Sequence, residues 1–111
     1  MRNDGLIELL KQKKEDIIDT IVMVASESLC PDFFGTYDIY LNVCDREIYV
    51  FMTESETNRI RDSSYYFLYS IKSNAVKCGE SLEKQIEAAN SEVVMAEATY
   101  ERILSYYLKM E

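Results

Sequence analysis

Apolar residues recur at alternating steps of four and three along the last third of the chain. The positions are Leu82, Ile86, Ala89, Val93, Ala96, Tyr100, Ile103, Tyr107 and Met110. Because an α-helix turns every ~3.6 residues, this spacing places the whole set on one side of a helix about 45 Å long. Such a stripe must be covered along its length. We therefore predict a single long helix over residues 80–110 that packs against other helices.

The start of the chain predicts a second long helix, over residues 4–29. Its apolar residues recur at helical spacing, and Pro31 prevents the helix from continuing. Residues 17–25 are apolar on more than one side, which favours a position in the core.

The period changes to two between residues 36 and 53, which predicts a β-hairpin. A two-residue turn at Asp45 and Arg46 would pair Val43 with Ile48. A longer loop remains the alternative, because this pair lacks the glycine that tight hairpin turns favour. The aliphatic residues then share one face of the hairpin, and its other face carries Tyr40, Tyr49 and Phe51.

Residues 55–77 show helical spacing and follow a capping box formed by Thr53 and Glu56. A short connection to the last helix predicts an antiparallel helical hairpin. The expected fold class is α+β, a single domain over residues 1–111 in the order α-β-β-α-α: a long N-terminal helix, a β-hairpin and a C-terminal antiparallel helical hairpin.

The charge of the chain excludes several function classes. Twenty acidic residues against twelve basic ones give a net charge of −8. Nucleic-acid binding depends on lysine and arginine, so we expect no direct nucleic-acid binding. The longest apolar run, residues 21–25, is too short to span a membrane, and residues 1–14 lack the apolar centre of a signal peptide. We expect a cytoplasmic protein without membrane contact.

The chain contains no histidine, and no spacing of residues identifies a catalytic site. Cys44 beside Asp45 could be a nucleophile, but a reduced, buried thiol is the favoured interpretation for Cys30, Cys44 and Cys78. We expect no enzymatic activity, no catalytic residues, no cofactor and no metal site.

Acidic residues of the last predicted helix form one candidate partner surface. Glu83 and Glu87, and then Glu97 and Glu101, lie four residues apart and so share one helix face. Hard metal ions take about six or more oxygen ligands, which disfavours a cation site. A solvated acidic face is the simplest interpretation. The alternative is a DNA mimic that occupies the nucleic-acid groove of another protein.

Tyrosine and arginine form the second candidate surface. Arg59, Arg61, Tyr65, Tyr66 and Tyr69 all fall on the helix predicted over residues 55–77. These residue types dominate the energetics of protein interfaces. The alternative is that the tyrosines lie over the edges of the core with hydrated hydroxyls.

These features favour a small acidic protein-binding module, a homodimer that inhibits a larger cytosolic protein with a basic, nucleic-acid-handling surface. The acidity and the expected order of elements are similar to those of many small phage and mobile-element proteins, a resemblance that implies an inhibitor of the phage anti-defence kind. A structural or chaperone-like subunit of a helical complex is the alternative. A small-ligand-binding domain on the aromatic hairpin face is a third hypothesis, which requires a closed pocket at Tyr40, Tyr49 and Phe51.

Overall fold

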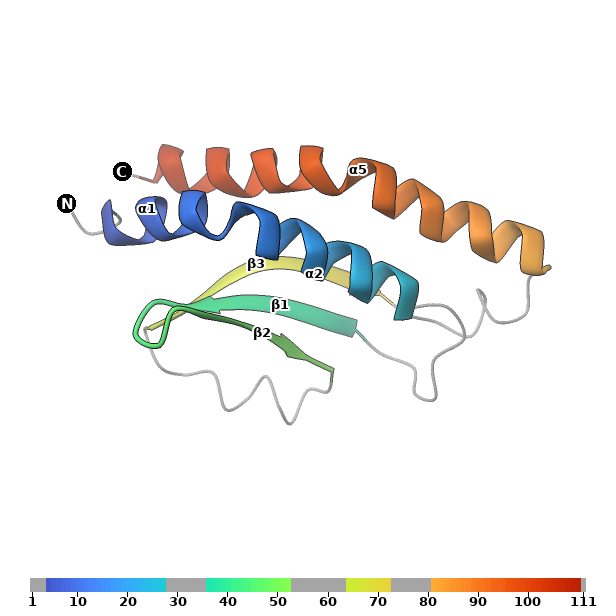
Figure 1. The fold of residues 1–111 in the computed structure, drawn as a ribbon, viewed down its shortest axis with the longest axis horizontal. Helices are drawn as coiled ribbons and strands as arrows, with labels where there is room; N and C mark the ends of the chain where they lie inside the picture. Colours follow the sequence, from blue (N-terminus) through green and yellow to red (C-terminus); the bar gives the residue numbers. More distant parts are fainter. Residues whose placement is uncertain (1–3, 28–35, 53–63, 73–80, 111) are drawn as a thin grey trace.

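A computed structural model describes residues 4–27, 36–52, 64–72 and 81–110. The elements are α1 (Asp4–Gln12), α2 (Lys14–Glu27), β1 (Thr36–Asn42), β2 (Glu47–Phe51), β3 (Tyr65–Lys72) and α5 (Leu82–Lys109). The strands form an antiparallel sheet in the order β2-β1-β3, and the three helices lie over one face of it (Figure 1). This confirms the α+β class.

Helices α1 and α2 correspond to the single helix predicted at the start of the chain. They are separated at Lys13, although the backbone hydrogen bonds continue there: Lys13 N donates to the Leu9 carbonyl at 2.9 Å, and Ile17 N donates to the Lys13 carbonyl at 2.8 Å. The change of direction lets α1 and α2 follow α5, which runs antiparallel to them (Figure 1).

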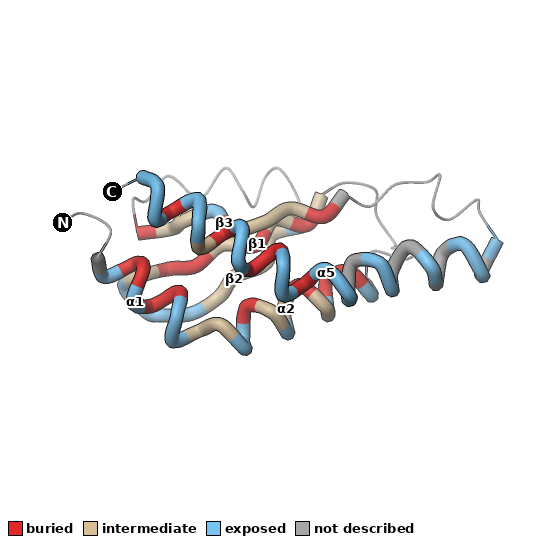
Figure 2. Tube along the Cα trace, turned by 90° about the horizontal axis from the view of Figure 1, so that it is seen from above, coloured by how far each residue is buried: buried red, intermediate tan, exposed pale blue. Residues whose placement is uncertain are grey.

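Both the helices and the sheet contribute buried residues, as Figure 2 shows. They form one cluster, to which α1, α2, β1, β3 and α5 all contribute. The largest fully buried side chains are Leu10, Ile17, Ile21, Val24, Ile39, Leu41 and Tyr100. Burial of this apolar surface is the main favourable contribution to the stability of the fold.

The β1–β2 hairpin is present, but its predicted register is wrong by two residues. Leu41 pairs with Ile48, and Ile39 pairs with Val50. The connection is the longer loop, in which the buried Asn42 side chain accepts hydrogen bonds from Cys44 N at 2.8 Å and Asp45 N at 3.1 Å. These bonds stabilise a turn that needs no glycine, although Arg46 adopts a φ of 63° in the left-handed region. A shift of two residues keeps the same faces inward.

Residues 65–72 form strand β3, so the predicted helix over 55–77 is wrong there, and with it the antiparallel helical hairpin. The rest of that predicted helix lies outside the described residues. Two observations explain the error. Aromatic residues favour strands, and a β-bulge shifts the register between Tyr40↔Phe67 and Ile39↔Tyr69. The bulge adds one residue to β3, so the buried Leu68 and Ile71 are three positions apart, which imitates helical spacing.

The last helix is confirmed by α5, which extends over 28 residues. Ser81 caps it, because the Ser81 hydroxyl accepts a hydrogen bond from Lys84 N. Ala96, Tyr100, Ile103 and Tyr107 of the predicted stripe are buried, whereas Met110 is exposed. The side chains of Leu82, Ile86, Ala89 and Val93 lie outside what the structure describes. In place of the predicted helix over 55–77, the covering elements are α1, α2 and β3 (Figures 1 and 2).

Candidate functional site

The sheet face opposite the helices carries a cluster of aromatic rings. No described element lies over this face (Figure 1). We call the set the outer aromatic cluster; its members are Tyr40, Tyr49, Phe51, Tyr65 and Phe67. They project together because the alternating residues of paired strands share one face of a sheet.

The rings of the outer aromatic cluster contact one another across all three strands. Tyr40 of β1 lies edge-on to Phe51 of β2 and to Phe67 of β3, with 5.6 Å between ring centroids in both pairs. Tyr49 is stacked on Phe51 at 6.1 Å and meets Tyr65 edge-on at 5.5 Å. These geometries are favourable for aromatic pairs and hold the rings in a defined surface.

Carboxylates accompany the outer aromatic cluster. Asp38 accepts a hydrogen bond of 2.7 Å from the Ser70 hydroxyl, and Asp45 accepts one from the Tyr49 hydroxyl. The bond to Asp45 raises the pKa of Tyr49 to about 12, while burial and the nearby Asp38 raise the pKa of Tyr40. A phenol is already neutral at pH 7 at its ordinary pKa of about 10, so these shifts only extend that state to higher pH. A surface of aromatic faces and carboxylates suits a cation, especially the planar guanidinium of arginine.

The predicted tyrosine surface is not one surface. Tyr65 belongs to the outer aromatic cluster, whereas Tyr66 and Tyr69 are on the other face of the sheet and pack against the core. Tyr66 lies edge-on to Tyr107 of α5, with 5.9 Å between centroids. On a strand, neighbouring residues point to opposite faces, so a set predicted for one helix face is divided. Arg59 and Arg61 lie outside the described residues.

The four predicted glutamates are all exposed on α5. Glu97 and Glu101 each lie 3.9 Å from the Lys14 ammonium, which also sits over the Tyr100 ring. Lys14 therefore offsets part of the charge at this end of the acidic face. Glu83 and Glu87 lie on the first half of α5, which extends beyond the sheet (Figures 1 and 2).

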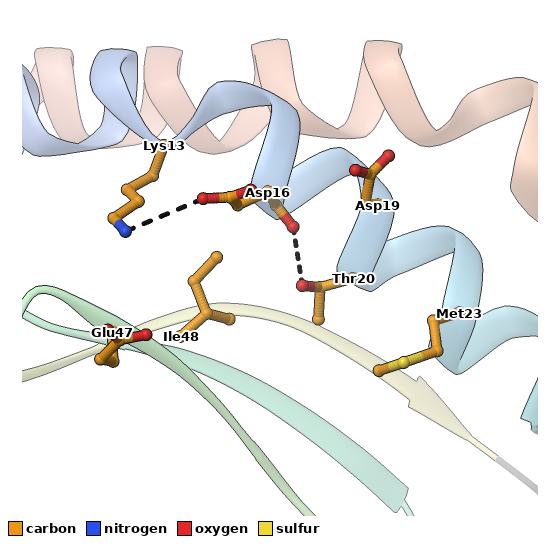
Figure 3. Close-up of a pocket in the computed structure, with 7 residues that line it drawn as sticks. All are labelled: Lys13, Asp16, Asp19, Thr20, Met23, Glu47 and Ile48. Atoms are coloured by element: carbon orange, nitrogen blue, oxygen red, sulfur yellow. Dashed lines mark hydrogen bonds and ion pairs between the residues drawn. The ribbon is translucent and has the colours of Figure 1, made fainter.

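A shallow pocket of about 310 Å³ separates α2 from the start of β2 (Figure 3). The ammonium of Lys13 lies 3.8 Å from the Asp16 carboxylate, and the Thr20 hydroxyl donates a 2.7 Å hydrogen bond to the Asp16 carbonyl. Asp19 and Glu47 complete the polar lining, and Met23 and Ile48 are its apolar members. With three acidic groups and one basic group, the lining of this pocket carries a net negative charge, as the whole chain does.

A larger groove, of about 460 Å³, lies between β3 and α5. We call it the β3–α5 groove; its lining residues are Phe67, Leu68, Tyr69, Thr99, Arg102, Ile103, Tyr106 and Tyr107. Neither of these two pockets includes Tyr40, Tyr49 or Phe51, so neither is the closed pocket that the third hypothesis requires.

The described residues contain no group of three side chains that could hold a metal ion. Cys44 is exposed in the β1–β2 turn, so the interpretation as a buried strand residue is wrong: the turn begins earlier than predicted. Cys30 and Cys78 lie outside the described residues.

Sequence reasoning missed three parts of these surfaces. Phe67 is 46% exposed, and its alternation with Tyr65 was the available signal that it shares a face with that residue. A signal was also available for Asp38, because it lies two positions before Tyr40 on the predicted strand and so shares its face. No local sequence pattern identifies Thr99 and Arg102 as groove residues, because their neighbours across the groove are about 30 positions earlier in the chain.

No protein family model matches the chain, and no curated protein or solved structure matches it either. Among the described residues, no helix combines the length and apolar character that crossing a membrane requires.

Proposed function

We propose that this chain is a small non-enzymatic protein-binding module that captures a basic segment of a protein partner on the outer face of its sheet. The outer aromatic cluster with its carboxylates, Asp38 and Asp45, carries this proposal. Arginine side chains of the partner stack on the rings and pair with the carboxylates. The net charge of −8 attracts such a partner and repels nucleic acid.

Inhibition is the form of this function that the charge favours. A basic surface that handles nucleic acid is complementary to the outer face, and a module bound there would block it. A cytoplasmic location and a homodimeric state belong to the same proposal. The DNA-mimic version places the contact on the glutamates of α5 instead, and the structure lends it less support because Lys14 pairs with Glu97 and Glu101.

The second candidate function is a structural subunit that covers a helix of its partner. Exposed apolar residues on α5 favour it: Val94, Met95 and Leu108 are 81%, 45% and 44% exposed. Binding through these residues would depend little on salt, whereas binding of a basic segment weakens as salt screens the charges.

Titration calorimetry with a nona-arginine peptide tests the first proposal. We expect the double variant Asp38→Asn with Asp45→Asn to bind the peptide about ten-fold more weakly than the original chain, since exposed charge pairs contribute up to about 1 kcal/mol each. Asparagine at position 38 keeps an acceptor oxygen for Ser70 Oγ, and asparagine at position 45 keeps one for Glu47 N, so the backbone contact of the turn is retained. The Tyr49 hydroxyl, which donates to the second Asp45 oxygen, then meets the amide nitrogen and accepts from it instead.

The matched control is the double variant Glu83→Gln with Glu87→Gln, which removes the same charge from α5. Its affinity for the peptide should stay within about two-fold of that of the original chain, because salt screens exposed charges that lie more than about one Debye length from the peptide. Equal losses in both double variants would mean that the peptide senses only net charge and would exclude the outer face as the site.

A further inference from the structure

The β3–α5 groove combines an apolar wall with three polar groups that have no partner among the described residues. Phe67, Leu68 and Ile103 form apolar lining, and a volume of about 460 Å³ falls in the usual range for small-molecule sites, about 300–1,000 Å³. The polar groups belong to Thr99, Arg102 and Tyr106, which are three and four positions apart. Side chains at this spacing are neighbours on one face of a helix, so Thr99 and Tyr106 lie on either side of Arg102 along α5.

Thr99 is the most informative member of this set. It is 3% exposed and lines the groove, yet its hydroxyl forms no hydrogen bond with any residue in the described ranges. Thr20 and Ser26 on α2 show the usual alternative, because each donates to the carbonyl four residues earlier. Among the described residues no fully buried side-chain oxygen or nitrogen lacks a partner, so the Thr99 hydroxyl keeps access to solvent through the groove that it lines. There it can donate a hydrogen bond to a ligand.

Arg102 determines the charge of the ligand. It is the one lining residue of this groove that carries a formal charge, and within the described part of the chain it forms no ion pair. A carboxylate that lies against Arg102 can accept hydrogen bonds from the guanidinium and from the hydroxyls beside it.

The groove suits a free small molecule better than an added peptide strand. The Tyr107 hydroxyl donates a hydrogen bond to the Phe67 carbonyl, so α5 already engages the backbone of β3 where the groove lies. That contact obstructs the main-chain pairing by which an extended peptide joins a sheet edge.

We propose that the β3–α5 groove binds a small amphipathic carboxylate, with the carboxylate held by Arg102, Thr99 and Tyr106 and the apolar body against Phe67, Leu68 and Ile103. This site is separate from the outer aromatic cluster apart from Phe67, which borders both. The proposal does not rest on the binding of a basic partner.

Octanoate and octanol are the probes, since they differ in the carboxylate and share the apolar chain. We expect octanoate to shift the backbone amide signals of residues 67–69 and 99–107 in a nitrogen–proton correlation spectrum, and to bind about ten-fold more tightly than octanol. Arg102→Gln should remove this preference and leave octanol binding unchanged. Thr99→Val, which keeps the shape of the side chain, should weaken octanoate binding several-fold.

Lys109→Gln is the matched control, because it removes one exposed positive charge from α5 outside the groove. It should bind octanoate as the original chain does, as should the double variant Asp38→Asn with Asp45→Asn. Absence of octanoate binding, equal binding of octanol, or an equal loss in Lys109→Gln would each overturn the proposal. A blocked peptide of alternating leucine and glutamate that binds while octanoate does not would overturn it in favour of peptide docking.

Discussion

Tyr100 shows at the scale of one residue how the core accommodates a polar group. Its side chain is 2% exposed, and its hydroxyl donates a 3.0 Å hydrogen bond to the carbonyl of Leu10. The bond connects α5 to the end of α1, residues 90 positions apart. The ring adds apolar burial, while the hydroxyl satisfies a carbonyl near the break between α1 and α2.

We predict that Tyr100→Phe lowers the free energy of unfolding by about 1–3 kcal/mol, because it leaves the Leu10 carbonyl buried without its partner. Chemical denaturation followed by circular dichroism measures the change. Tyr106→Phe is the control: Tyr106 is 59% exposed, and its loss of a hydroxyl should change stability by less than about 0.5 kcal/mol. Equal effects in the two variants would show that the bond to Leu10 contributes nothing.

Tyr107 makes the stability of the fold depend on pH in the alkaline range. Burial, followed by the neighbouring tyrosines, raises the pKa of Tyr107 to about 12, above the value of about 10 in an unfolded chain. The folded state thus favours the neutral phenol. The contribution of this preference to the free energy of unfolding is fully present below pH ~10 and is lost as the pH rises toward ~12. We predict that this decline in the free energy of unfolding is smaller in Tyr107→Phe, as measured by urea denaturation across that range. An identical decline in both proteins would contradict the assignment.

At the scale of elements, α5 contributes through one stripe of its surface. Ile103 is 5% exposed and belongs to the core cluster, whereas Val94 on the same helix is 81% exposed. The difference follows from the helical period, which returns Ala96, Tyr100, Ile103 and Tyr107 to the side of the core.

We predict that Ile103→Ala lowers the free energy of unfolding by about 2–5 kcal/mol, since it removes buried methyl groups and leaves a cavity. Val94→Ala should change it by less than about 0.5 kcal/mol. Thermal and urea denaturation of both variants measure the contrast. Comparable losses in the two would mean that the exposed side of α5 is also covered, as in the homodimer that the sequence favours.

At the scale of the whole molecule, two electrostatic effects oppose each other. The net charge of −8 produces self-repulsion in the folded state, which salt relieves. The described ion pairs, such as Lys14 with Glu97, are weakened by salt, but they are exposed and contribute less than about 1 kcal/mol each.

We therefore predict that added sodium chloride raises the midpoint of urea denaturation, because relief of the repulsion exceeds the loss of the surface pairs. The measurement is a series of denaturation curves from low to physiological ionic strength. A midpoint that falls with salt would show that the ion pairs around Lys14 dominate. Lys14→Gln distinguishes these cases, since it removes the pairs to both glutamates.

Much of the fold could be predicted from local pattern. A hydrophobic stripe over 28 residues defines a helix without any knowledge of its neighbours, so α5 was recognised almost to its ends. The alternation in β1 and β2 likewise defined two strands and their inward faces. Register was less certain, because the same faces remain inward after a shift of two residues.

The candidate sites depended much more on tertiary structure. The sequence by itself determined the long helix, the hairpin and the acidity, because each follows from periodicity or from a sum of charges. Only the tertiary structure decided that residues 65–72 form a strand, because pairing with β1 and the bulge at Leu68 replace a local helical pattern. That pairing moves Tyr65 beside Tyr49 and Phe67 beside Tyr40, and it creates the groove with α5. Surfaces assembled from segments far apart in the chain leave no local signal, because their spacing is set by packing rather than by the period of one element.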